Sequence, residues 1–372
     1  MLFKPLNIIL IYLVCCCNLL YISAPFLAFL IPFVEFNRGV FTISTSYVAG
    51  VGHFYMLTVF LIFFLMLAYC LLDYLFGFSV RSSLNGCKRY EKYKEYDFLT
   101  PIITQVREKF NQNSVKLYIK NTDEICAFAV GSFGAKSIVI SRGMIEHYLV
   151  LCTEPKMFLS VVRSVLSHEM SHLINKDFLP SFIIMTNQKI TNFFSAFLHL
   201  IFIYLARAID MIPKTGRSSA NAMIFTYNLI NNFLMFFNSY IVFNLYNFLH
   251  KFLSRSIEYR CDNQASKAFG GHNMALALSM LGHKGFFTIF SSHPSTKSRI
   301  KKIENIKMKE SVIGPTFFDA FINYLTLLMM LMLTMIFAKL AKIDLIIRQI
   351  LQNHQEIYRK LSYLWQLINK FI

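Results

Sequence analysis

The stretch His168-Glu169-Met170-Ser171-His172 lies near the middle of the 372-residue chain, and it decides how the rest of the sequence is interpreted. Residues four apart on a helix share one face, about one turn along the axis, so the two histidines can present imidazoles to one metal ion. The glutamate follows the first histidine directly and can reach a water on that metal. This pattern indicates a catalytic zinc site, where zinc acidifies a water and the carboxylate takes its proton.

A second motif, within residues 254–262, offers the third ligand. Glu258 and Asp262 are also four apart and share a helical face. Two histidines and one glutamate leave the fourth position of a zinc ion open for water, as a catalytic site requires. Asp262 could accept a hydrogen bond from a ligand histidine and fix its orientation.

Each motif has a plain alternative when it is taken alone. His168 and His172 could be surface histidines that bind nothing, and Glu258 could be an exposed helix carboxylate. The two motifs together favour the metal site. We therefore expect one zinc ion per chain, held by His168, His172 and Glu258, with Glu169 as the general base.

The composition indicates a membrane protein. Hydrophobic residues make up 55% of the chain, and phenylalanine alone occurs 39 times. The net charge of +17 falls mostly beside apolar runs, where anionic lipid and topology explain it, and no nucleic-acid motif accompanies it. We expect the lipid bilayer as a partner and no nucleic acid. The eight cysteines form no Cys-x-x-Cys pair, which argues against a disulfide framework or a thiolate zinc site.

Apolar runs divide the chain into membrane and polar segments. Five runs cover about residues 7–34, 47–80, 179–208, 222–249 and 317–337. A helix needs about 20 apolar residues to cross a bilayer, so four or five crossings are expected. Basic residues cluster at 81–94, 251–260 and 297–309, which the positive-inside rule places in the cytoplasm.

The membrane topology offers an independent check on the site. His168 and Glu258 must lie on the same side of the membrane to share a metal ion, so an even number of crossings must separate them. The two apolar runs within 179–249 form a hairpin that satisfies this condition. The predicted active site then faces the cytoplasm, close to the bilayer surface.

Residues 98–152 begin a soluble domain. Strands are expected at 115–119, 125–130 and 137–141, with glycines in the turn between the last two. Pro155 suits a first helical position and should open a helix that runs to about Asn175. This helix carries the first zinc motif.

The C-terminal tail has a heptad pattern. Apolar residues from Ile343 to Phe371 recur in spacings of four and three. Such a seam predicts a self-associating helix. An amphipathic helix lying on a membrane surface is an equally good interpretation.

Together these motifs resemble the HtpX-like membrane zinc metallopeptidases, relatives of the CAAX prenyl proteases. The resemblance covers roughly residues 1–305 and rests first on the two zinc motifs with the apolar hairpin between them. Two shorter segments also match: Cys126-Ala127-Phe128-Ala129-Val130-Gly131 looks like the family's Asn-Ala-Phe-Ala-Thr-Gly strand, and Ser292-His293-Pro294 with Arg299 looks like its Thr-His-Pro segment. Cys126 departs from the family by replacing its usual asparagine.

The resemblance implies a gluzincin-type zinc endopeptidase of the cell inner membrane that takes part in quality control of membrane proteins during stress. It implies that the strand with Ala127, Phe128 and Ala129 binds extended polypeptide substrates by β-addition. It also implies that His293 or Arg299 lies near the site and stabilises the oxyanion. The plain alternatives are a loop residue for His293 and a further lipid-facing cation of the basic cluster for Arg299. The fifth apolar run and the tail lie beyond the family's usual four-helix pattern.

The fold predicted is mainly α: a polytopic membrane protein with four or five transmembrane helices and a cytoplasmic α+β metalloprotease domain with a small β-sheet. The expected segments are a transmembrane hairpin (1–80), the first part of the protease domain (81–178), a transmembrane or embedded hairpin (179–250), the second part of the protease domain (251–311), a fifth transmembrane helix (312–338) and the amphipathic tail (339–372).

Two other functions are compatible with parts of the sequence. A catalytically inactive membrane scaffold or adaptor would keep the fold and use the tail for assembly. A transporter would explain the asparagines in the apolar hairpin but not the two zinc motifs. Glu169 favours the protease, because a structural zinc site needs no general base.

Overall fold

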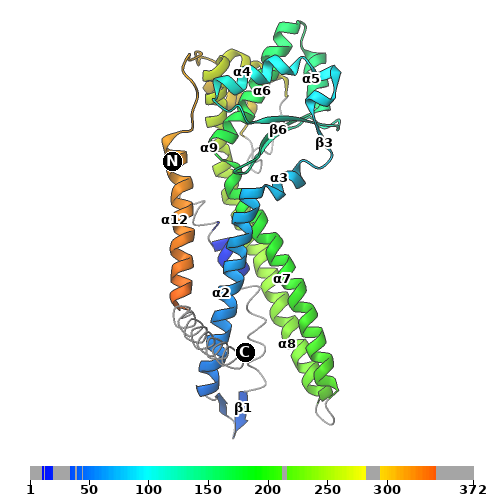
Figure 1. Ribbon diagram of the computed structural model, residues 1–372, viewed down its shortest axis with the longest axis vertical. Coiled ribbons are helices and arrows are strands. Elements are labelled where there is room, and N and C mark those ends of the chain that lie inside the picture. Colours follow the sequence, from blue (N-terminus) through cyan, green and yellow to red (C-terminus); the bar gives the residue numbers. More distant parts are fainter. Residues whose placement is uncertain are drawn as a thin grey trace, which may run out of the picture.

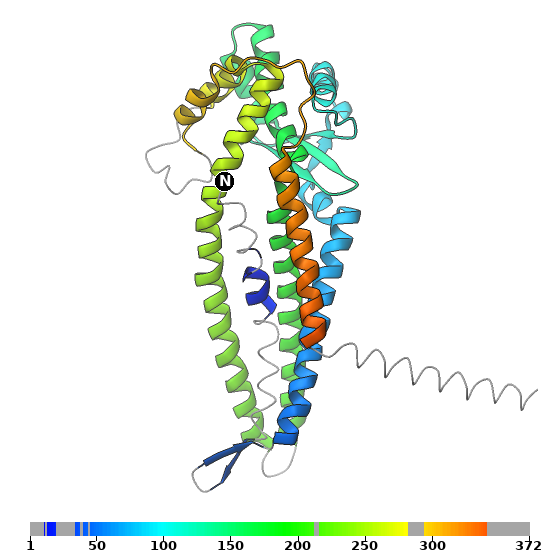
Figure 2. The same ribbon diagram turned by 90° about the vertical axis from the view of Figure 1, so that its left-hand side faces the viewer.

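The computed structural model describes residues 11, 13–19, 34–37, 40–43, 45–211, 216–281 and 294–340. Over these residues the molecule is elongated, with a globular domain at one end and long helices extending away from it (Figures 1 and 2). Three predictions fall wholly or mostly outside the described residues. They are the crossing at about residues 7–34, the placement of His293 and the heptad segment beyond residue 340.

A four-stranded mixed sheet forms one layer of the globular domain. Its strands follow the order β3 (Cys87–Arg89), β4 (Lys116–Lys120), β6 (Lys136–Ser141) and β5 (Ala127–Gly131). β4 and β6 are parallel, and the other neighbouring pairs are antiparallel. Leu117 and Ile119 alternate with more exposed residues along β4, because successive side chains of a strand point to opposite faces. The sequence predicted the last three strands but missed β3, which has only three residues inside a basic segment.

Around this sheet and the two longer helices beside it, short helices complete the globular domain. They are α3 (Phe78–Ser83), α4 (Leu99–Lys109), α5 (Arg142–Leu151), α10 (Gly271–Met280) and α11 (Thr296–Ile303), with two 3-10 turns at Tyr90–Lys92 and Lys94–Tyr96. The main hydrophobic core includes fully buried side chains from α4, α5 and the sheet, among them Leu99, Tyr148 and Ile138. Burial of these apolar side chains stabilises the domain by roughly 1.5–3 kcal/mol each.

Helix α6 (Pro155–Ile174) runs through the middle of the globular domain. Pro155 occupies the start of the helix as predicted, and Ile174 ends it one residue before the predicted position. Most residues between Phe158 and Ile174 are buried, because α6 packs on the sheet as well as on α4, α5, α9 and α10. Its polar residues are therefore held in a protein interior.

The fourth apolar run and the second zinc motif belong to one continuous helical rod. α8 (Gly216–Phe236) passes through a π-helical segment (Phe237–Val242) into α9 (Phe243–Phe269). The rod leads from the helix bundle into the globular domain, where α9 packs against α6 (Figures 1 and 2). The second zinc motif and the fourth apolar run are therefore parts of the same rod.

The bundle also contains α2 (Thr45–Phe76), α7 (Phe178–Asp210) and α12 (Phe317–Leu340). A small hairpin of β1 (Val34–Asn37) and β2 (Val40–Ile43) lies at the end far from the globular domain (Figure 2). Among the described residues, one helix, Phe182–Asp210, is long and apolar enough to cross a membrane, and Leu61–Phe76 is a shorter apolar helix. Four or five crossings therefore stay a prediction.

Candidate metal centre

The side chains of both zinc motifs converge where α6 meets α9. His168 Nε2 lies 3.4 Å from Glu258 Oε2, and His172 Nε2 lies 3.8 Å from Glu258 Oε1. The Nε2 atoms of the two histidines are 3.2 Å apart. The structure thus brings together the three ligands that the sequence predicts, with one donor atom of each within 4.8 Å of the others.

The chemistry of these donors fits a zinc ion. Two imidazole nitrogens and one carboxylate form the ligand set of many catalytic zinc sites, which keep a further position open. His168 is 7% exposed and Glu258 5% exposed, so a cation there would be largely shielded from bulk water. Glu169 is also buried and follows His168 on α6, where the sequence places the general base.

The field around the two histidines is strongly negative. Burial lowers the pKa of His168, but hydrogen bonds and charge from Asp262 and Glu258 outweigh burial and raise this pKa to about 10. Burial also lowers the pKa of His172, and the charge of Cys261 with nearby carboxylates raises it well above its ordinary value. At least one proton is therefore held at the histidine pair at neutral pH. A divalent cation can take the place of such protons, as metal binding to histidine generally does.

A carboxylate holds each histidine ring from behind. His168 Nδ1 lies 2.9 Å from Asp262 Oδ1, and His172 Nδ1 lies 2.9 Å from Asp177 Oδ2. This arrangement favours the tautomer with the proton on Nδ1, which leaves Nε2 free to bind a metal ion. Asp262 thus lies beside a candidate ligand histidine, where the predicted role would place it, and that role stays a prediction.

Asp177 was not predicted. It follows the end of α6 by three residues, and sequence spacing alone does not show that the chain folds back there. A carboxylate five residues after the second histidine was the available signal.

Arg299 lies at the site, as the sequence predicted, but its contacts favour a different role. It is 9% exposed and donates two hydrogen bonds to Asp262, of 2.7 and 2.6 Å. Its Nη2 also lies 3.1 Å from Glu258 Oε2. Because its guanidinium is bound to these two carboxylates, the geometry favours Arg299 as a positioning residue for the second motif rather than an oxyanion donor.

A second group of polar residues surrounds Asp177. Arg260 forms ion pairs with Asp177 and with Asp319 of α12. Cys261 is buried, and its Sγ lies 3.4 Å from His172 Nδ1. One sequence signal could have indicated Asp319, since an ionisable residue inside an apolar run usually has a partner.

The predicted substrate strand lies beside the metal helix. β5, with Ala127, Phe128 and Ala129, is an edge strand of the sheet and packs against α6. Gly131 at its end lies close to Leu173 of α6 and Phe178 of α7. An edge strand offers unpaired backbone groups to an incoming extended chain.

The two motifs on α6 and α9, the helical hairpin between them and the edge strand are together typical of a metallopeptidase. Residues 99–307 match peptidase family M48. This match covers more than half of the chain, which therefore belongs to that family.

Curated relatives place the chain within the family. It is 27% identical over 234 residues to Protease HtpX of Buchnera aphidicola subsp. Schizaphis graminum, covering 56% of this chain and 73% of that protein. It is 28% identical over 226 residues to a Protease HtpX homolog of Neisseria meningitidis serogroup C, covering 56% of this chain and 72% of that protein. The chain is thus an HtpX-like M48 protease.

A solved structure is also similar. The crystal structure of S. mikatae Ste24p aligns with a TM-score of 0.40 and 16% identity. The alignment covers 67% of this chain and 58% of the Ste24p chain.

Proposed function

We propose that this chain is a zinc-dependent endopeptidase that hydrolyses peptide bonds of membrane or misfolded proteins. The observation that carries the proposal is the buried convergence of His168, His172 and Glu258 at the contact of α6 and α9, with Glu169 buried beside them. When bound there, zinc supplies Lewis acidity that polarises a carbonyl and acidifies a water.

The protein's own groups supply the remaining chemistry. Glu169 would accept a proton from the attacking water and deliver it to the departing amine. Asp262 and Asp177 would hold the imidazoles of His168 and His172 in their orientation. β5 would align an extended substrate along α6 by adding it as a further strand.

The proposal includes a membrane location. We place the protein as a multi-pass protein of the cell inner membrane with its site facing the cytoplasm. The apolar helix Phe182–Asp210 and the basic segments 81–94 and 297–309 support this placement. A site near the bilayer surface suits substrates that are themselves membrane-bound, which supports a role in quality control.

Epitope insertion tests this topology. An epitope after Asn37 should be reached by antibody in spheroplasts, whose outer membrane has been opened, whereas one after Asn85 should be reached only after the inner membrane is permeabilised as well. Exposed turns tolerate such insertions. Labelling of both epitopes from the same side would overturn the proposed placement.

The activity is tested with Glu169→Gln and a matched control, Glu154→Gln, which changes an exposed glutamate at the start of the same helix. Wild type and both variants should contain about one zinc per chain by elemental analysis. Casein cleavage in detergent should persist in wild type and Glu154→Gln, stop with a chelator, and fall by about a hundredfold or more in Glu169→Gln.

Two results would contradict the proposal. One is wild-type protein without zinc whose cleavage added zinc does not restore. The other is full activity in Glu169→Gln. Either result would favour an inactive membrane scaffold, which needs neither a metal nor a general base.

A further inference from the structure

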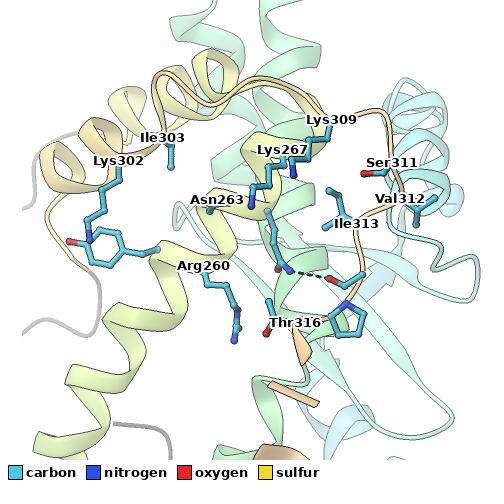
Figure 3. Close-up of a pocket in the computed structure, with 14 residues that line it drawn as sticks. Arg260, Asn263, Lys267, Lys302, Ile303, Lys309, Ser311, Val312, Ile313 and Thr316 are labelled. Carbon is cyan, nitrogen blue, oxygen red and sulfur yellow. Dashed lines mark hydrogen bonds between the residues drawn. The ribbon is translucent and has the colours of Figure 1, made fainter. Parts of the chain in front are cut away.

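A cavity lies beside the metal centre, between α9, α11 and the segment that leads into α12 (Figure 3). Its volume is about 580 Å³, within the range of small-molecule binding sites. Arg260 and Thr316 lie at one end of it, and Lys267 and Lys309 at the other (Figure 3).

The lining of this cavity is strongly basic. Arg260, Lys267, Lys302 and Lys309 line it, and no carboxylate does so among the described residues. The charge of Arg260 is matched by its ion pairs with acidic residues outside the cavity. The three lysines therefore supply the unmatched positive charge of the cavity. The Lys302 ammonium lies 3.4 Å from the centroid of the Tyr259 ring, and this cation–π contact does not neutralise the lysine.

The backbone holds two of these lysines together. The amide of Lys309 donates to the carbonyl of Lys267, at 2.7 Å, so an extended segment and a helix present neighbouring ammonium groups (Figure 3). Like charges brought together in this way repel each other, and a bound anion would remove the repulsion. Figure 3 shows both side chains over the same hollow.

The wall opposite α9 is fixed in place rather than loose. Gln264 donates to the carbonyl of Gly314 at 3.1 Å, and the amide of Thr316 donates to Asn175 Oδ1 at 3.2 Å. Ile313 is 7% exposed and packs into the main core. The cavity is therefore pre-organised, which lowers the cost of binding.

The location of the cavity indicates which class of anion it binds. The fixed wall continues directly into α12, the fifth apolar run, which starts at Phe317. The Thr316 end of the cavity adjoins the start of α12, so this end faces the lipid head groups where α12 enters the bilayer, and Lys267 and Lys309 lie at the end farther from it (Figure 3). We propose that this cavity binds the phosphate group of an anionic lipid. This inference rests on the proposed membrane location but not on peptidase activity.

The test compares two double variants that remove equal charge. Lys267→Gln with Lys309→Gln empties the cavity of two cations, whereas Lys301→Gln with Lys307→Gln removes two exposed lysines nearby that do not line it. The full-length protein, purified in uncharged detergent, is titrated with phosphatidylglycerol, phosphatidylcholine or inorganic phosphate. Binding is measured by native mass spectrometry and by the shift of the melting temperature.

Wild type and the exposed-lysine variant should bind phosphatidylglycerol alike and prefer it over phosphatidylcholine. The cavity variant should bind phosphatidylglycerol about tenfold or more weakly. Ser311→Asp, which adds a carboxylate at the rim, should weaken binding in the same way without removing a lysine. Equal losses in both double variants would overturn the proposal, because a diffuse basic surface would then explain binding. Inorganic phosphate that binds as tightly as the lipid would overturn the assignment to a lipid. The epitope test of topology stands apart, so failure of either proposal can be recognised separately.

Discussion

Arg260 and Asp319 join α9 to the first turn of α12 through an ion pair in which Nη1 and Oδ2 are 2.6 Å apart. The same guanidinium binds Asp177, whose Oδ2 lies 2.9 Å from Nδ1 of the candidate zinc ligand His172. Asp319 is 3% exposed. A helix outside the residues matched by the family, 99–307, is thus linked through two ion pairs to a carboxylate beside the candidate metal centre.

We predict that Asp319→Asn destabilises the protein and weakens its hold on zinc. Removing one partner of a buried ion pair costs about 3–5 kcal/mol when the other charge is left unpaired, and the cost here is smaller because Asp177 still pairs with Arg260. Arg260 would then bind Asp177 alone and hold it less firmly against His172. The measurements are the melting temperature and the rate at which a chelator removes zinc.

Asp123→Asn is the matched control for this prediction. Asp123 pairs with Arg142, but 84% of its side chain is exposed. Exposed pairs contribute about 1 kcal/mol or less, so this variant should melt and lose zinc as wild type does. Indistinguishable behaviour of Asp319→Asn and Asp123→Asn would show that α12 does not support the centre.

Asp262→Asn should reduce zinc affinity about 10- to 100-fold, the usual effect of losing the hydrogen-bond partner of a ligand histidine. The variant leaves His168 without an anionic partner on Nδ1 and frees part of Arg299. Zinc affinity is measured by competition with a chromophoric chelator. Asp97→Asn, a change at an exposed aspartate, should leave the affinity unchanged. An unchanged affinity in Asp262→Asn would mean that the ring is held by other contacts.

Zinc affinity should rise with pH up to about pH 10. The pKa of His168 in the metal-free protein is about 10, above the ordinary value of 6.5, so zinc must displace at least one proton at neutral pH. Each displaced proton makes the affinity change about tenfold per pH unit. His168→Gln should flatten this slope when affinity is measured between pH 7 and 9. A wild-type affinity that is flat over this range would contradict the prediction.

The raised pKa of His168 also makes the stability of the metal-free protein depend on pH. A raised folded-state pKa gives stability that is fully present below pH 6.5 and is lost as the pH rises toward 10. The melting temperature of chelated wild type should therefore fall over this range, and His168→Gln should reduce the fall.

The candidate metal ligands could be predicted because helical spacing is a local property. His168 and His172 share a face on any helix, and chemistry then demands a third ligand such as Glu258. The strand with Ala127 and Phe128 was also accessible, because its composition and turn glycines are local signals.

The contacts made by Asp177 and Asp319 could not be predicted from local sequence patterns. Asp177 reaches His172 only because the chain turns at the end of α6, and Asp319 reaches Arg260, 59 positions earlier in the chain, through tertiary packing. β3 is too short for periodicity to show. The continuous rod from α8 to α9 was hidden because its composition changes from apolar to basic while its backbone stays helical.

The last prediction concerns substrate binding at β5. β5 and β3 are the two edges of the same sheet, and only β5 packs against α6. A peptide bound to Glu169→Gln, which should not cleave it, would pair with backbone groups of β5 and slow amide hydrogen exchange across Ala127–Gly131. Exchange across Cys87–Arg89 provides the internal control and should not change, because that edge lies away from the metal helix. Slower exchange at both edges would indicate general stabilisation of the domain, and slower exchange at β3 alone would place the substrate on the wrong side of the sheet for Glu169 to act on it.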